Sequence, residues 1–342
     1  MFMFAKFIFI AFVVSCQSQI NDSHQQKKKI QIKKIASTSQ EWLDVARFDG
    51  KQDSKISFEQ GITNWLTHTH QIDAQPLCSG VLDSNSDGKE EVFVGYGSSR
   101  SYRNKKAQIW QYTDEGATLV WTGSENAMIS DMHGTEHGLY VVVSNDKQEM
   151  EGGFLDIVSK TLNIKHTQKL ALRQYPLDKE RILVGRVYGD VPKSDGDLRY
   201  SDSKEQIPTK RGIRALQMAD LNSDGHLDLL VSDGWHFQYG TNAQARIVLY
   251  EGPDFQQYRT IGNFDEDYSI NRIDVSDDKM FLLAIGSKFG YILFLDELGW
   301  KSIQIAEIGE RGTMRFLHSQ DDLQVVVSGN KGGVFQISNV NP

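Results

Sequence analysis

The sequence predicts an all-β fold, and three observations lead to this expectation. Short runs rich in Val, Ile, Leu and aromatic residues recur along the chain at a period of about 47 residues. Turn residues separate further short runs, so that about four strands fit into each repeat. No segment shows an apolar stripe at helical spacing over three turns, which indicates low helix content. Repeats of this length and strand number are typical of the blades of a β-propeller.

The repeats predict a single propeller domain over residues 37–342 with seven four-stranded blades. Six blades with a capping segment is the alternative, because the unit at 171–211 is the least regular. The last unit, 312–340, lacks an outermost strand and the first unit lacks an innermost one, whereas residues 30–35 supply a spare strand. We therefore expect the two ends of the chain to pair and close the ring. The related runs are residues 43–48, 92–96, 140–144, 183–187, 229–232, 282–286 and 325–329.

Composition excludes several classes of protein. The 342 residues include 37 basic and 45 acidic side chains, giving a formal net charge of −8. This balance argues against nucleic-acid binding, which needs a basic surface to displace counterions. The two cysteines are too few for a disulfide-stapled scaffold or a cysteine-only zinc site.

The N-terminal segment predicts export. Residues 2–15 are apolar except for Lys6. This run is too short to span a bilayer, but its length is typical of the apolar core of a signal peptide, which we assign to residues 1–15. The sequence Val-Val-Ser-Cys ending at Cys16 resembles the lipobox of bacterial lipoproteins. The resemblance implies lipidation of Cys16 and, with Gln17 following, an outer-membrane-anchored protein of the cell envelope. A secreted or periplasmic protein with an incidental Cys16 is the alternative.

Residues 16–36 are then expected to carry the lipid and act as a polar tether, with the end of this segment available as a strand. The membrane would be contacted only through this anchor.

Two loops share the pattern D-x-N-x-D-G-x-x-[DE], and this pattern predicts calcium binding. Side-chain oxygens at positions 1, 3 and 5 converge because Gly at position 6 permits a sharp turn, and calcium prefers such oxygen ligands. An EF-hand is excluded, because position 12 is Val94 in one loop and Val231 in the other instead of Glu. The first loop contains Asp83, Asn85, Asp87, Lys89 and Glu91, and the second contains Asp220, Asn222, Asp224, His226 and Asp228.

With these loops in view, the chain resembles the FG-GAP or VCBS-type repeats of integrin-α-like β-propellers. The resemblance is strong over residues 78–96 and 214–233 and extends by period and strand pattern over about 37–340. It implies that each loop joins the first two strands of a blade. It also implies two structural Ca²⁺ sites, with Lys89 and His226 ligating through their carbonyl groups and the other eight residues through their side chains. Glu91 replaces the usual Asp, which makes the first site the less regular one.

A ligand-binding face is expected opposite the calcium loops. Three connections between second and third strands are long, at residues 97–108, 189–211 and 233–246. They combine aromatic side chains, which stack on sugar rings, with cations that pair with carboxylates or sulfates. Solvated loops whose aromatic residues pack on the blades are the alternative. The candidate ligand-face residues are Arg100, Tyr102, Arg103, Tyr200, Trp235, His236 and Tyr239.

Two classes of function remain open from the sequence. The first is a non-enzymatic binding or scaffolding module on the cell envelope for a glycan or protein ligand. The second is a polysaccharide lyase acting on uronate-containing glycans, which needs a cation on the carboxylate and a base for the adjacent proton. Its residues would be His236, Tyr239, Arg199 and Arg214.

Other histidines are expected to be structural. His68 and His70 alternate on one strand face without a nearby third ligand, which favours surface residues over a metal site. His133, Glu136 and His137 lie in a hairpin, where a polar turn is favoured over a transition-metal site.

Overall fold

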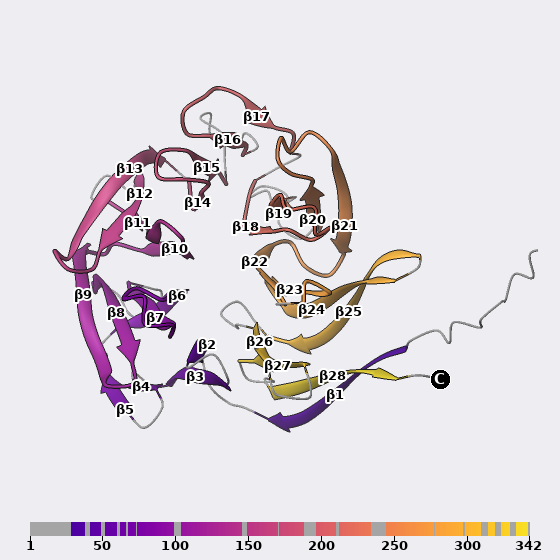
Figure 1. Cartoon of the computed structure of the whole chain (residues 1–342), viewed down its shortest axis with the longest axis horizontal. Coiled ribbons are helices and arrows are strands. Elements are labelled where there is room, and N and C mark those ends of the chain that lie inside the picture. The colour runs from indigo at the N-terminus through magenta and orange to yellow at the C-terminus, as the bar shows by residue number, and fades with distance from the viewer. Residues whose placement is uncertain are drawn as a thin grey trace, which may run out of the picture.

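A computed structural model shows an all-β propeller. It describes residues 29–37, 42–48, 52–59, 62–65, 68–72, 74–98, 104–145, 149–169, 171–187, 196–209, 212–233, 244–276, 278–296, 298–308, 314–318, 323–328 and 333–340. Within these ranges the strands β1 to β28 form seven antiparallel sheets of four strands each. The sheets follow one another around a ring (Figure 1). The predicted β-propeller fold is confirmed, and seven sheets are the larger of the two numbers that the repeat allowed.

Each sheet is one blade, and its four strands follow one another from the centre of the ring outward. One blade has β2 (Trp42–Phe48), β3 (Gln52–Glu59), β4 (Ile62–Trp65) and β5 (His68–Gln71). The next has β6 (Gln75–Leu82), β7 (Glu91–Gly97), β8 (Lys106–Thr113) and β9 (Gly116–Glu125). The third has β10 (Ile129–Thr135), β11 (Gly138–Ser144), β12 (Glu149–Asp156) and β13 (Thr161–Lys169).

The remaining blades continue the same order. The fourth has β14 (Arg173–Pro176), β15 (Ile182–Gly185), β16 (Leu198–Tyr200) and β17 (Gln206–Ile207). The fifth has β18 (Ala215–Ala219), β19 (Asp228–Asp233), β20 (Ala245–Tyr250) and β21 (Tyr258–Phe264). The sixth has β22 (Ile270–Val275), β23 (Phe281–Gly286), β24 (Phe289–Asp296) and β25 (Gly299–Glu307). The last has β26 (Met314–His318), β27 (Leu323–Val327), β28 (Gly333–Val340) and β1 (Lys29–Ser37).

The last blade takes its outermost strand from the other end of the chain. β1 pairs antiparallel with β28, from Lys29 opposite Val340 to Ser37 opposite Gly333. The predicted pairing of the chain ends is therefore correct, and the first strand of the propeller starts at Lys29, inside the segment expected to be a tether. The first blade, in contrast, has its own innermost strand. β2 is that strand, and it is not the equivalent of β7 as the sequence repeat suggested.

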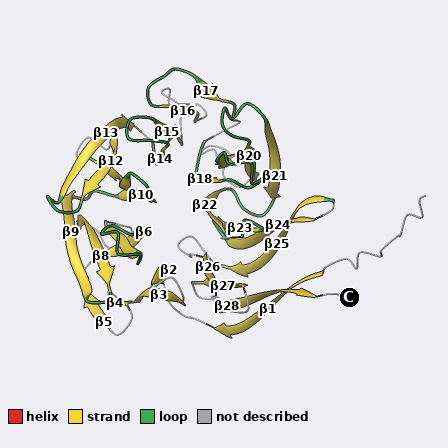
Figure 2. Cartoon of the chain, in the orientation of Figure 1, coloured by secondary structure: helices red, strands yellow, loops and turns green. Residues whose placement is uncertain are grey.

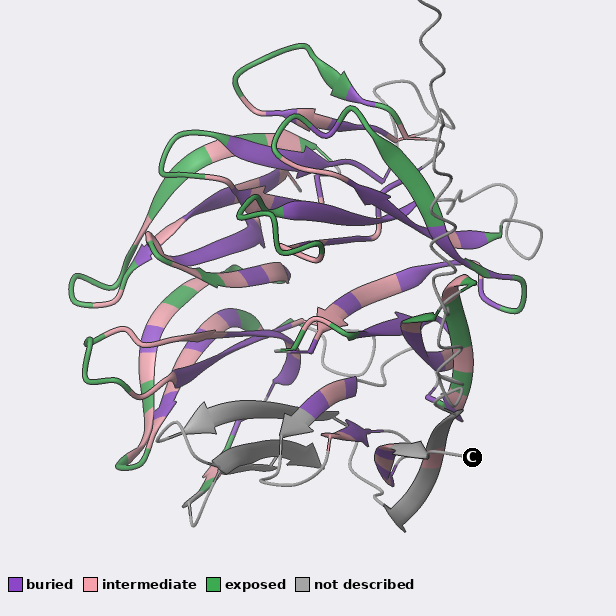
Figure 3. Ribbon diagram, turned by 45° about the vertical axis from the view of Figure 1, so that its right-hand side comes forward, coloured by how far each residue is buried: buried purple, intermediate pink, exposed green. Residues whose placement is uncertain are grey.

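The hydrophobic core lies between neighbouring blades. Leu230 of β19 and Leu282 of β23 share one buried cluster, and Phe93 of β7 and Val141 of β11 share another. The second strand of a blade is buried on both faces, which explains its continuous apolar sequence, and the outer strands alternate. For the described residues, Figure 2 shows only strands and loops, and Figure 3 shows buried residues concentrated on the inner strands. The unit at 171–211, which has the least regular sequence, contains the two shortest described strands, β16 and β17.

The first strands of all seven blades lie nearest the axis of the ring (Figure 1). β2 contacts β26, so the first and last blades are neighbours and the inner ring is continuous. The two predicted calcium loops join first to second strands, and the segments 97–108 and 233–246 join second to third strands. The prediction of a single long loop at 189–211 is wrong, because this segment contains β16 and β17 and only its part before Leu198 joins β15 to β16. Since successive connections within a blade alternate between the two faces, the two kinds of loop lie on opposite faces of the ring.

Candidate functional site

The first acidic loop connects β6 to β7 and folds around its own carboxylates. Asp83 accepts hydrogen bonds from the amides of Asp87 at 3.1 Å and Gly88 at 2.9 Å. The amide of Asp87 also donates to Asn85 Oδ1 at 2.9 Å. Gly88 has a φ of +84°, in the left-handed region that favours glycine. Glu91 is 3% exposed and accepts from the amide and hydroxyl of Ser84, both at 2.7 Å.

The second loop, between β18 and β19, repeats this geometry. Asp220 accepts from the amides of Asp224 at 3.1 Å and Gly225 at 3.2 Å, and Gly225 has a φ of +88°. Asp228 is 1% exposed and accepts from the amides of Leu221 and Gly252, both at 3.0 Å. Hydrogen bonds from the His226 amide and the Asn222 side chain lower the pKa of Asp224, which keeps that carboxylate ionised.

These donor sets fit calcium chemically. In the first loop, carboxylate oxygens of Asp83, Asp87 and Glu91 lie within 4.8 Å of one another, which is compatible with a shared ion. Among the described residues this is the one acidic or histidine group that meets this distance criterion. In the second loop, Lys279 lies 3.7 Å from Asp220 and competes electrostatically with a cation there. The geometry thus favours the first loop, although its sequence is the less regular of the two.

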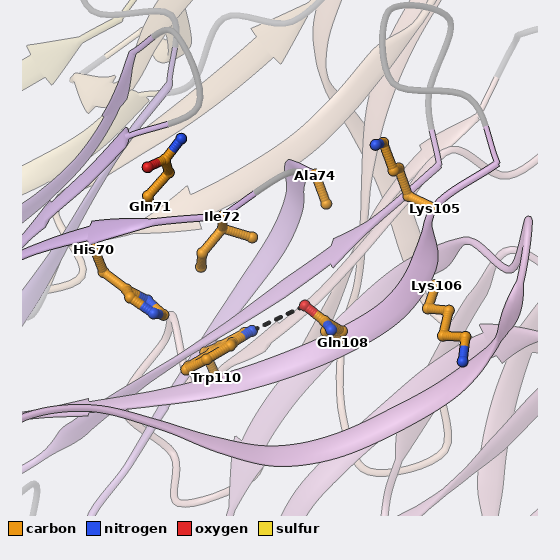
Figure 4. Close-up of a pocket in the computed structure, with 8 residues that line it drawn as sticks. All are labelled: His70, Gln71, Ile72, Ala74, Lys105, Lys106, Gln108 and Trp110. Atoms are coloured by element: carbon orange, nitrogen blue, oxygen red, sulfur yellow. Dashed lines mark hydrogen bonds between the residues drawn. The ribbon is translucent and has the colours of Figure 1, made fainter.

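A separate pocket lies between the outer part of the first blade and the blade that follows it. It has a volume of about 210 Å³ and is lined by residues of β5, of the segment after β5, and of β8 and the residue before it (Figure 4). We call it the interblade pocket. Its lining residues are His70, Gln71, Ile72, Ala74, Lys105, Lys106, Gln108 and Trp110.

Two aromatic rings and two amines give the interblade pocket its chemical character. His70 packs edge-on against Trp110 with ring centroids 4.2 Å apart, and the Trp110 indole donates to Gln108 at 3.2 Å. Figure 4 shows Lys105 and Lys106 on the side of the pocket away from His70. Burial lowers the pKa of His70, so its ring is neutral at pH 7, and its Nδ1 atom is buried without a hydrogen-bond partner among the described residues.

The sequence did not predict this pocket, and none of the candidate ligand-face residues lines it. Lys105, Lys106 and Gln108 belong to the long loop 97–108 that was expected to contact a ligand, but His70 was expected to be a surface residue. His70 is half-buried, and it meets Trp110 only because two blades pack side by side. No pattern in the sequence links the two residues.

Of the predicted ligand-face residues, the structure describes only Tyr200. Tyr200 is 5% exposed and belongs to a buried cluster, with the Arg181 guanidinium 4.2 Å above its ring, so it presents little surface to a ligand. The other ligand-face candidates, Arg100, Tyr102, Arg103, Trp235, His236 and Tyr239, lie outside the described residues, as do the signal segment and Cys16.

The residues of the predicted lyase site fall into separate interactions where they are described. Arg199 on β16 pairs with Asp197, which also accepts from Arg186 at 2.6 Å. Arg214, just before β18, donates to Asn271 Oδ1 at 3.1 Å on the inner ring. Burial alone would raise the pKa of Asp197, but Arg186 and Arg199 outweigh it and lower that pKa. Arg199 therefore already has a carboxylate partner.

His133 and His137 each lie beside an acidic side chain. His133 lies 3.1 Å from Asp131, and His137 lies 3.5 Å from Glu136. In the described ranges, neither pair belongs to a group with metal-binding spacing. Cys78 is buried, and its thiol donates to the carbonyl oxygen of Ile129 at 3.9 Å. No described helix is long and apolar enough to cross a membrane.

Comparison with known proteins adds distant likenesses of fold. No family model matches the chain, and no curated protein matches it. A solved structure of a functionally unknown protein from Desulfotomaculum acetoxidans DSM 771 is 12% identical with a TM-score of 0.47, over 88% of this chain and 98% of that one. The periplasmic gluconolactonase PpgL of Pseudomonas aeruginosa is 11% identical with a TM-score of 0.48, over 91% of this chain and 100% of that one. At these values neither protein's activity carries over to this chain.

Proposed function

We propose that this protein is a cell-envelope-tethered binding propeller that holds an acidic sugar residue of a glycan in the interblade pocket. Calcium in the two acidic loops stabilises the fold in this proposal, and lipidation at Cys16 supplies the tether. The observation that carries the binding role is the combination of an aromatic wall and two lysines around one small cavity.

The size and lining of the pocket suit one sugar ring. A cavity of about 210 Å³ can admit one monosaccharide unit. Trp110 contributes aromatic surface of the kind on which sugar rings stack, and the buried Ile72 and Ala74 add apolar lining. Glycans are therefore a better match than an extended peptide.

The polar groups of the pocket favour a carboxylate on that sugar. Lys105 and Lys106 bring two positive charges to one side, whereas no acidic residue is among the described residues that line the pocket. The neutral His70 ring and the amides of Gln71 and Gln108 can exchange hydrogen bonds with sugar hydroxyl groups. A uronate residue presents this combination of charge and hydroxyl groups.

Binding is favoured over the lyase alternative because the described lyase candidates have other partners. A lyase needs a base beside a carboxylate-binding cation. Arg199 pairs with Asp197, and Arg214 donates to Asn271.

The proposal is tested by calorimetric titration of the purified protein with oligogalacturonate and oligoalginate fragments. We expect binding to at least one fragment, weakened at least tenfold by Trp110→Ala and by the double variant Lys105→Gln/Lys106→Gln. Lys301→Gln, on the exposed outer strand β25, is the matched control and should bind as the wild type does. Absence of binding to both fragments, or binding unaffected by the pocket variants, would refute the proposal. Release of unsaturated products that absorb ultraviolet light would instead indicate the lyase.

A further inference from the structure

The inner strands bring a second set of charged residues together at the axis of the ring. We define the central cluster as Ser79 of β6, Asp131 of β10, Arg173 of β14, Arg272 and Asp274 of β22, and Arg315 of β26. These residues are far apart in sequence, and they meet because their strands surround the same axis (Figure 1).

Two arginines converge on one serine hydroxyl. Arg272 Nη2 lies 3.5 Å and Arg315 Nη2 lies 3.4 Å from Ser79 Oγ, across 193 and 236 residues of sequence respectively. The two nitrogen atoms are therefore no more than about 7 Å apart, a separation at which like charges repel unless a counter-charge lies between them. Both contacts use the serine oxygen as acceptor, which leaves its hydroxyl proton for another acceptor.

The carboxylates of the cluster are fewer than its guanidinium groups. Asp274 lies 3.4 Å from Arg315, and Asp131 lies 3.9 Å from Arg173 and 3.1 Å from His133. Arg214 adds a fourth guanidinium close by, and its described partner Asn271 is neutral. The described side chains at the axis thus include four arginines and two aspartates.

The arginines of the central cluster differ in how many hydrogen bonds their guanidinium groups donate to backbone carbonyl oxygens. Arg173 donates to the carbonyl oxygens of Ser130, Arg214 and Asn271, so this residue joins three inner strands. Arg272 has only the long contact to Ser79 among its described hydrogen bonds, and its side chain is half-buried. Arg315 is 14% exposed, so solvent and small solutes reach this part of the cluster.

We propose that a small oxyanion group, a carboxylate, phosphate or sulfate, binds at the axis against Ser79 and between Arg272 and Arg315. Planar guanidinium groups donate paired hydrogen bonds to such groups, and the serine hydroxyl supplies a further donor. The anion adds negative charge to a group in which Arg315 already pairs with Asp274 and the charge of Arg272 already acts on Asp131. This site is independent of the interblade pocket, which lies at the outer strands and shares no residue with it.

The experiment is calorimetric titration of the full protein with sodium acetate, phosphate and sulfate at constant ionic strength set by sodium chloride. We expect at least one of the three anions to bind with a stoichiometry of one. Arg272→Gln and Ser79→Ala should each weaken that binding at least tenfold. Arg259→Gln is the matched control, because Arg259 is 57% exposed on the outer strand β21.

Each outcome decides the proposal. Failure of all three anions to bind, or equal binding by Arg272→Gln and Ser79→Ala, would overturn it. Ser79→Ala removes one hydroxyl without adding bulk, so it keeps the test valid where an arginine variant does not fold. Trp110→Ala should retain anion binding, which separates this result from the fate of the glycan proposal. The anion that binds identifies whether a carboxylate or an inorganic oxyanion is preferred.

Discussion

Ile32 of β1 lies opposite Ile337 of β28, so residues from the two ends of the chain form neighbouring positions in one sheet. Ile337 is 5% exposed in a buried cluster of the last two blades, and Ile32 packs against that cluster. The pairing supplies the fourth strand of the last blade and covers the edge that β28 would otherwise expose. Ring closure therefore depends on a segment that composition alone assigns to a tether.

Loss of this contact should weaken the whole domain. Ile32→Ala removes apolar contacts at the closing strand, and we expect it to lower the free energy of unfolding by about 1–3 kcal/mol. Urea unfolding followed by tryptophan fluorescence measures the change. Lys301→Ala on the exposed outer strand β25 is the control, with an expected change within about 0.5 kcal/mol. Equal stability of the two variants would show that β1 does not hold the ring closed.

Calcium should stabilise the fold through the acidic loops. At a free concentration about 100 times the dissociation constant, one bound ion raises the free energy of unfolding by about 2.7 kcal/mol. We expect thermal unfolding at a higher temperature with calcium than with chelator. Asp83→Asn and Asp220→Asn should each reduce that difference, whereas Asp202→Asn, an exposed turn residue, should preserve it. An unchanged transition, together with no calcium by elemental analysis, would contradict both sites.

The glycine turn of the second loop gives a prediction that does not require metal. Gly225 has a φ of +88°, and a Cβ atom placed there would meet no atom within 4 Å. Gly225→Ala therefore introduces backbone strain without a steric clash, and we expect it to cost about 1–2 kcal/mol in chelator. Asn adopts left-handed conformations more readily, so Gly225→Asn should cost less. Chemical denaturation of both variants tests this order, and the reverse order would contradict it.

Asp131 on the inner strand β10 should make the free energy of unfolding fall at acid pH. Burial alone would raise the pKa of Asp131, but the charges of His133 and Arg173 outweigh it and lower that pKa. A lowered carboxyl pKa contributes stability above the unfolded value of about 3.9, and this contribution is lost as the pH falls through the folded value. Asp131→Asn should thus be less stable than the wild type at pH 7 by about 1.5–3 kcal/mol.

The pH dependence of stability gives a second test of Asp131→Asn. Its difference from the wild type should shrink as the pH falls below the unfolded value of about 3.9, because the unfolded wild type then binds a proton that the folded state, with its lowered pKa, does not yet bind. Equilibrium unfolding from pH 3 to pH 7 measures the difference, and Asp202→Asn provides the baseline. A difference that does not vary with pH would mean that Asp131 acts through packing and not through its charge.

The fold was predictable because its signals are local and repeated. The period of about 47 residues and the alternation within outer strands reflect blades that each need the same apolar faces. The turn at Gly88 was predictable for a similar reason, since its hydrogen bonds link residues within one loop. The assignment of β2 was wrong because an inner strand and a second strand of a blade look alike when both are apolar.

The sequence by itself determined the propeller, the pairing of the chain ends and the two acidic loops, because each depends on residues close together in the chain or on a simple repeat. Only the tertiary structure brought His70 against Trp110 and placed Arg272 and Arg315 on Ser79. These contacts arise from the packing of one blade against the next and from the closure of the ring, which place residues together regardless of their separation in sequence.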